Sequence, residues 1–162
     1  MTEYDVTAWS DFANTVSGGA AALAGLLFVG LSLNLSEVLK YPGVPARAAA
    51  TLGLTVAILL TAIFVATPGQ SFRALAIEIG VIGALTAAMV LAGMAQQRAG
   101  THRNRVLTSM VMLLLPAVLL IVAAISLWVQ RGGGLYWITA AVTTGFVSAT
   151  ANAWVLVVEL KR

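Results

Sequence analysis

The chain has 162 residues, of which 60% are hydrophobic and 9% are charged, and its formal net charge is +3. Soluble domains average about half apolar and a quarter charged residues, so this composition excludes an ordinary soluble domain. The longest polar intervals, 1–11, 37–47 and 96–105, are too short to bury a core of their own. The sequence therefore predicts a single membrane-embedded domain over residues 1–162. The absence of cysteine also excludes disulfides and thiolate metal sites.

Residues 1–11 carry three acidic side chains and no lysine or arginine, which is unlike the basic start of a cleaved signal peptide. We therefore expect the first hydrophobic stretch to be kept as a helix. Each stretch without charged residues is long enough to cross a bilayer core, which takes roughly 20 apolar residues in a helix that satisfies its own backbone hydrogen bonds. Five such stretches, of 19 to 27 residues, occupy 12–36, 48–72, 79–97, 106–130 and 132–158.

These stretches predict an all-α fold, an integral membrane bundle of five transmembrane helices. The predicted spans are about 13–36, 48–67, 74–95, 106–129 and 135–158. The main alternative has four spans, because the stretch 79–97 is the shortest and starts only after Glu78. That alternative would place the basic cluster at 98–105 and the C-terminus on opposite sides of the membrane. Five spans fit the distribution of cations better.

The short loops carry their cations unevenly. With five spans, one side of the membrane holds only Arg73 and Arg131. The other side holds seven cations: Lys40, Arg47, Arg98, Arg103, Arg105, Lys161 and Arg162. Because short loops rich in lysine and arginine stay in the cytoplasm, the N-terminus is predicted outside and the C-terminus in the cytoplasm. The predicted outer ends also gather aromatic residues that favour the headgroup layer: Tyr4, Trp9, Trp128, Tyr136 and Trp137.

Small residues predict where the helices pack, since helices in lipid associate through close backbone contact. One set, at every fourth position of the third span, is Gly80, Ala84, Ala88 and Ala92. A second set, in the fifth span, is Ala141, Gly145, Ala149 and Ala153. The first span has small residues around its whole circumference, so we expect it to be enclosed by protein. The leucine-rich fourth span, with a kink at Pro116, is expected to face lipid.

Glu78 is the first candidate for a functional residue. It lies near the predicted outer end of the third span, and a carboxylate inside a span is costly enough to be treated as functional by default. The alternative is a structural acid that reaches the interface or pairs with Arg73 or Arg131. The sequence leaves both interpretations open.

The fifth span carries a second set of candidates on one helical face: Thr144, Ser148, Asn152 and Glu159. At about 1.5 Å per residue this stripe extends over roughly 22 Å, and it would be expensive to expose to lipid. The first span offers a counterpart in Asn34. Two interpretations follow: a hydrogen bond between Asn34 and Asn152 that joins the two helices, or a polar pathway lined by them.

The sequence contains no motif that is typical of an enzyme. The sole histidine, His102, lies in a basic loop, and neither aspartate nor lysine lies inside a predicted span. These absences argue against metal, haem, aspartyl-dyad and serine–lysine sites, so we expect no enzyme, no metal and no cofactor. The basic residues flank membrane spans, where orientation explains them, so we expect no nucleic acid partner.

Segments spread over nearly the whole chain resemble those of a known protein family. The matching segments are 9–12, 20–34, 68–70, 77–78, 134–137 and the run NAWVLVVE at 152–159. With them the chain resembles a family of small bacterial membrane proteins, mostly hypothetical and sometimes described as modulators of the FtsH protease. The resemblance implies a multi-pass protein of the bacterial cytoplasmic (inner) membrane. It picks out Glu78, Asn152, Glu159 and the predicted outer turn, where Gln70 and Arg73 are further candidates.

Two functions agree with these observations. An inverted-repeat transporter is disfavoured by the odd number of spans and by the lack of an internal repeat. The leading hypothesis is a homo-oligomeric channel for ions or small solutes, with polar faces of several protomers around one axis. The alternative is an accessory or regulatory subunit that binds another membrane protein or a protease complex. The channel leads because an accessory subunit needs neither an intramembrane acid nor a long polar stripe. Membrane lipid is a partner in both.

Overall fold

The computed structural model describes residues 4–40, 43–97 and 103–160, and in these ranges it does not describe the side chains of 94–97, 103–110 and 157–160. The described chain is helical and contains no strand, so the predicted all-α fold is confirmed. The elements, in chain order, are the 3₁₀-helix η1 (Val6–Trp9), α1 (Ser10–Leu33), α2 (Leu35–Lys40), α3 (Val44–Ala66), α4 (Phe72–Gln97), α5 (Arg103–Val129) and α6 (Tyr136–Leu160). The predicted basic positions 98–102, 161 and 162 lie outside the described residues.

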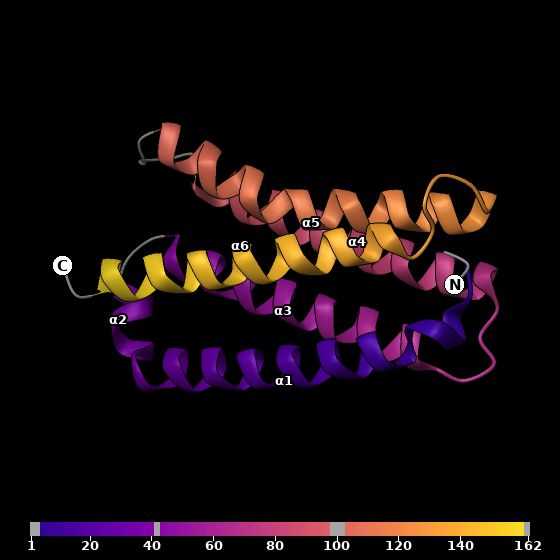
Figure 1. Cartoon of the computed structure of the whole chain (residues 1–162). Helices are drawn as coiled ribbons and strands as arrows, with labels where there is room; N and C mark the ends of the chain where they lie inside the picture. Colours follow the sequence, from indigo (N-terminus) through magenta and orange to yellow (C-terminus); the bar gives the residue numbers. More distant parts are fainter. Residues whose placement is uncertain (1–3, 41–42, 98–102, 161–162) are drawn as a thin grey trace.

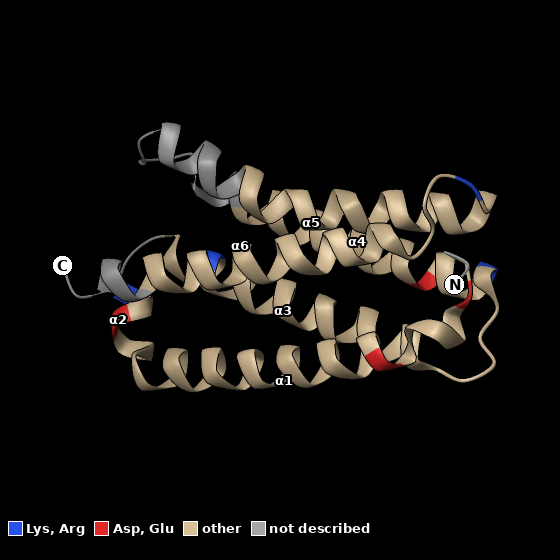
Figure 2. Cartoon of the chain, in the orientation of Figure 1, with Lys and Arg blue, Asp and Glu red and all other residues tan. Residues whose placement is uncertain are grey.

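The five long helices run side by side along one axis, with α1 along one edge of the bundle and α5 along the opposite edge (Figure 1). The most extensive contacts join α4 with α5 and α1 with α3, and α3 also packs on α4 and α6. Helix α3 is therefore the centre of the bundle. The described lysines, arginines, aspartates and glutamates lie toward the two ends, and the middle of the bundle carries none of them (Figure 2).

Four described helices are long and apolar enough to cross a membrane: Val6–Leu33, Val44–Ala66, Phe72–Gly93 and Val111–Val129. This finding supports a multi-pass membrane protein. The helix outside this set is α6, although it has 25 residues. Its described side chains include the polar residues Thr143, Thr144, Ser148, Thr150 and Asn152, whereas the side chains of the apolar Val157 and Val158 near its end are not described. The five predicted spans correspond to the five long helices, and four of these helices are shown to be long and apolar enough to cross a membrane.

Glycines occupy the turns where the backbone needs positive φ. Gly43, with φ 88°, precedes α3, which has a proline in its first turn. Between α5 and α6, the three glycines of 132–134 all have positive φ. Ser126 ties this turn together, since its Oγ accepts from the Gly134 N–H at 2.9 Å and donates to the Arg131 carbonyl at 2.6 Å. The glycine run is thus a structural turn.

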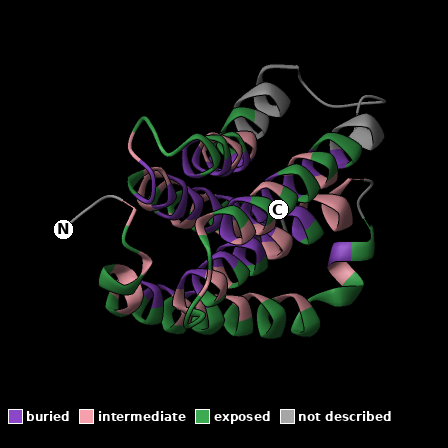
Figure 3. Ribbon diagram, turned by 90° about the vertical axis from the view of Figure 1, so that its right-hand side faces the viewer, coloured by how far each residue is buried: buried purple, intermediate pink, exposed green. Residues whose placement is uncertain are grey.

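Two glycines lie at close contacts between helices. A Cβ added to Gly83 of α4 would lie 3.0 Å from Ile121 Cγ1 and 3.2 Å from the Ala117 carbonyl oxygen of α5. A Cβ added to Gly145 of α6 would lie 2.7 Å from Ile58 Cδ1 of α3. Glycine at both positions lets neighbouring helices approach each other closely. Buried residues concentrate in the middle of the bundle and exposed ones around its outside (Figure 3).

The predicted seam on α6 is correct, but the one on α4 is wrong. Ala141, Gly145 and Ala149 are buried and Ala153 is half-buried, whereas Ala84, Ala88 and Ala92 are exposed and only Gly80 of that set is half-buried. Helix α4 turns a neighbouring stripe inward, one residue away in register. That stripe consists of Ile79, Gly83, Thr86 and Val90.

Two further packing expectations are corrected by the structure. Helix α1 is not enclosed, because only 11% of its most apolar 18 residues are buried. A Cβ added at Gly18, Gly25 or Gly30 would meet no other atom within 4 Å. Helix α5 does not simply face lipid, because Leu113 and Leu120 are buried against its neighbours. Helix α5, which is rich in leucine, thus buries one of its faces in the bundle. Helix α1, which is rich in small residues, lies along one edge.

Candidate functional site

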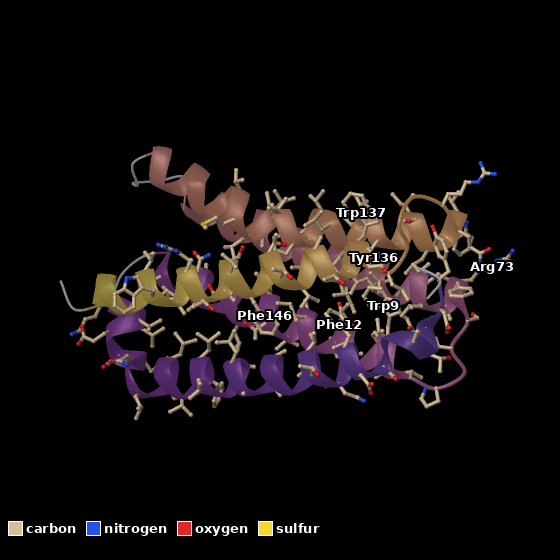
Figure 4. The ribbon with its side chains drawn as sticks, in the orientation of Figure 1. Trp9, Phe12, Arg73, Tyr136, Trp137 and Phe146 are labelled. Atoms are coloured by element: carbon tan, nitrogen blue, oxygen red, sulfur yellow. The ribbon has the colours of Figure 1, made fainter. Side chains whose placement is uncertain are left out.

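Glu78 lies two turns into α4 and is paired with Gln70 in the turn that follows α3. The Gln70 Nε2 atom donates a hydrogen bond to Glu78 Oε2, and both residues are half-buried. The predicted pairing with arginine is not formed: Arg73 and Arg131 are exposed, and neither makes an ion pair with Glu78. Figure 4 shows Arg73 at the end of the bundle, directed away from it. The sequence singled out Gln70 and Glu78, and the structure brings them together.

Three buried polar atoms near this end of the helices have no hydrogen-bond partner within the described residues. They are Gln70 Oε1, Tyr4 Oη and Thr139 Oγ1. The Tyr4 ring packs edge-on against Phe72 at the start of α4, with 6.4 Å between centroids. Because buried polar groups are normally paired, this end of the bundle has unused capacity to bind water or another polar group.

Aromatic side chains fasten the N-terminal segment to α6. The Trp9 ring lies 4.9 Å from the Tyr136 ring and 5.5 Å from the Phe12 ring, with both pairs edge to face (Figure 4). Trp137 donates from Nε1 to the Gly132 carbonyl at 2.5 Å. The predicted gathering of these aromatic residues at one end of the bundle is confirmed. Such a cluster is suited to a membrane–water interface.

The polar stripe of α6 lies inside the bundle. Ser148 is 4% exposed and Asn152 is 3% exposed. Thr144 Oγ1 donates to the Ala140 carbonyl at 2.7 Å, and Asn152 Nδ2 donates to the Ser148 carbonyl at 2.9 Å, so both bond to their own helix. Ser148 Oγ instead donates to the Met112 carbonyl of α5 at 2.5 Å. The side chain of Glu159, the fourth predicted member, lies outside the described residues.

The predicted hydrogen bond between Asn34 and Asn152 is absent. Asn34 is exposed, and its Nδ2 donates to the Gly30 carbonyl of its own helix at 2.9 Å. Between α1, α3 and α6 lies a pocket of about 190 Å³ with an almost entirely apolar lining that includes Leu27, Leu52 and Leu156. Side-chain amides can bond to the carbonyl four residues earlier, which removed the need for a partner across the pocket.

Buried hydroxyl groups on α3 were not predicted from the sequence. Thr51, Thr55 and Thr61 are all buried. Their Oγ1 atoms donate to the carbonyls of Arg47, Thr51 and Ala57 at 2.9, 3.0 and 2.8 Å. The four-residue spacing of Thr51 and Thr55 was the available signal. Because each hydroxyl donates to a carbonyl of its own helix, none of the three needs a water molecule as its acceptor.

Comparison with protein-family models, curated proteins and solved structures gives no match for this chain. The described residues also contain no group of three metal-binding side chains.

Proposed function

We propose that the protein is a non-enzymatic integral membrane protein with five transmembrane helices, its N-terminus outside and its C-terminus in the cytoplasm. At about 1.5 Å per residue the 25 residues of α6 extend over roughly 37 Å, enough to cross a hydrocarbon core. The polar residues that lower its hydropathy include Ser148 and Asn152, which are turned into the bundle and hydrogen-bonded. These features support a fifth span at α6.

Cysteine labelling tests this topology. Single cysteines at positions 2, 69 and 133 should react with an impermeant thiol reagent added to whole cells, and cysteines at 43 and 100 should not. The chain has no native cysteine, so only the introduced thiol can react. Labelling of position 100 in intact cells would overturn the five-span arrangement.

Within the membrane, the protein acts as an accessory subunit that binds a transmembrane helix of another protein along α1. The observation that carries this proposal is the exposure of α1. This helix packs mainly on α3, and its small residues Gly18, Ala21 and Gly25 point outward. Small residues on a helix face allow a second backbone to approach closely, which drives association in lipid. The family resemblance adds one partner of this kind, a membrane protease complex containing FtsH.

The experiment compares two variants that place leucine at an exposed small residue, Gly25→Leu on α1 and Ala88→Leu on α4. A photoreactive residue in place of the exposed Val29, one turn after Gly25 on the same face, should crosslink to the partner helix in membranes. We expect Gly25→Leu to abolish this crosslink and Ala88→Leu to retain it, with the thermal stability of both variants unchanged. Equal crosslinking in the two variants, or no crosslinked protein at all, contradicts the proposal. Crosslinks only between copies of this chain favour a homo-oligomer instead.

A homo-oligomeric channel is the second candidate, and the Gln70–Glu78 pair is the observation that favours it. A half-buried carboxylate beside an unpartnered amide oxygen would attract cations at an outer mouth. Ser148 and Asn152 are buried within one chain, so other residues would line the pathway between protomers. Glu78→Gln should then reduce cation current in planar bilayers without preventing assembly. A folded oligomer with no flux under any ionic gradient would remove this candidate.

A further inference from the structure

Pro116 interrupts the hydrogen-bond ladder of α5 near its middle. A proline has no N–H, so the carbonyl four residues earlier, that of Met112, loses its helical partner. Met112 lies nine residues after the start of α5, roughly 14 Å along the helix axis. In a membrane this position is far from water, where an unpaired carbonyl is costly.

Ser148 supplies the missing donor from another helix. Its Oγ donates to the Met112 carbonyl at 2.5 Å, a bond between residues 36 positions apart. Gly145, one turn earlier on α6, makes the approach close enough, since a Cβ there would lie 3.7 Å from Pro116 Cβ. Pro116 is fully buried at this contact. The serine, the glycine and the proline thus form one complementary arrangement.

Ser148 differs from the four buried threonines of the described chain. Thr51, Thr55, Thr61 and Thr86 each donate to the carbonyl four residues earlier in their own helix. The same local bond, to the Thr144 carbonyl, would be open to Ser148. Ser148 can therefore be satisfied in two ways, whereas the Met112 carbonyl is satisfied in only one of them. Loss of the Ser148 bond would therefore leave the Met112 carbonyl unpaired.

We propose that Pro116 is a hinge in α5 and that Ser148 is the latch that holds the helix to α6 at Met112. When the latch is released, the N-terminal half of α5 swings about Pro116. The C-terminal half, 117–129, stays fixed because it packs closely on α4 at Gly83. This device is independent of the proposed partner binding at α1.

Double electron–electron resonance between spin-labelled cysteines tests the hinge in the cysteine-free chain. One label pair, at positions 104 and 154, reports on the half of α5 that moves. A control pair at the exposed positions 125 and 147 reports on the fixed half. Position 104 lies 12 residues from the hinge, so a swing of about 20° displaces it by roughly 6 Å.

Ser148→Ala should add a second distance, shifted by roughly 6 Å, to the first pair and leave the control pair unchanged. Pro116→Ala restores the N–H that pairs with Met112. The double variant Ser148→Ala/Pro116→Ala should therefore return to a single distance, and Ser148→Thr should keep one. An unchanged distribution in Ser148→Ala, equal broadening of both pairs, or no recovery in the double variant would overturn the proposal. If Ser148→Ala does not fold, failure of Pro116→Ala to rescue folding counts against it equally.

Discussion

The contact between α4 and α5 at Gly83 can be tested by a substitution that adds one methyl group. Gly83→Ala would place a Cβ 3.0 Å from Ile121 Cγ1, 3.2 Å from the Ala117 carbonyl oxygen and 3.2 Å from Leu120 Cβ. None of these atoms is the free end of a flexible side chain. The two helices must therefore separate by a few tenths of an ångström to admit the methyl group. Overpacking of this kind typically costs about 1–3 kcal/mol.

Gly93→Ala is the matched control, because Gly93 is buried on the same helix. Its added Cβ would lie 3.9 Å from the Ala46 carbonyl oxygen and 4.0 Å from Ala46 Cβ, which is ordinary contact. Both substitutions gain about 1 kcal/mol of helix propensity. Gly93→Ala should thus raise the free energy of unfolding by about 1 kcal/mol. Gly83→Ala should lower it by up to about 2 kcal/mol after the same gain is subtracted.

The free energy of unfolding can be measured by titrating sodium dodecyl sulfate into detergent micelles and following the fluorescence of the four tryptophans. The expected result is a difference of about 1–3 kcal/mol between the two variants, with opposite signs relative to the wild type. Equal shifts for Gly83→Ala and Gly93→Ala would refute the close approach of α4 and α5. Gly83→Leu, with a larger side chain in the same contact, should be more destabilising than Gly83→Ala.

Three further predictions use the same assay. Glu78→Leu removes the acceptor for the Gln70 amide and should destabilise the fold by about 1–3 kcal/mol. Glu78→Gln keeps an acceptor and should cost less. Equal losses of stability in the two variants would mean that this hydrogen bond contributes nothing. Trp137→Phe removes the donor to the Gly132 carbonyl and should cost about 0.5–1.5 kcal/mol, more than Trp128→Phe at an exposed position. Ala84→Leu should change stability by less than about 0.5 kcal/mol because Ala84 is exposed, and a larger loss would restore the seam predicted from sequence.

The positions of the helices were predictable because charged residues bound each apolar stretch. The predicted spans 48–67 and 106–129 differ by only a few residues from Val44–Ala66 and Arg103–Val129. Whether a face rich in small residues is buried within this chain was not predictable. Small residues mark a face that another backbone can approach, whether that backbone belongs to the same chain or to a different one. The stripe on α6 faces inward, and the stripe of Ala84, Ala88 and Ala92 on α4 faces outward.

The residues of the candidate site were predicted from the sequence, but the hydrogen bonds between them were not. Glu78 and Gln70 were both chosen, but the turn that brings them together involves positive φ at Gly69, which fixes a geometry not visible in residue spacing. The link between Asn34 and Asn152 was wrong because each amide bonds to a carbonyl four residues earlier in its own helix. Local bonds of this kind are always within reach, so a polar residue inside a span does not require a distant partner.

This local satisfaction changes what the polar residues of α6 say about function. In lipid, a hydroxyl or amide demands water or a partner helix only when its own backbone cannot accept from it. Thr144 and Asn152 are satisfied within α6, and Ser148 is occupied with the carbonyl that Pro116 leaves free. The polar stripe is thereby accounted for inside one chain, without a water-filled path. The outward face of α1 has no counterpart among the described helices, which supports the proposed association along α1 over the proposed channel.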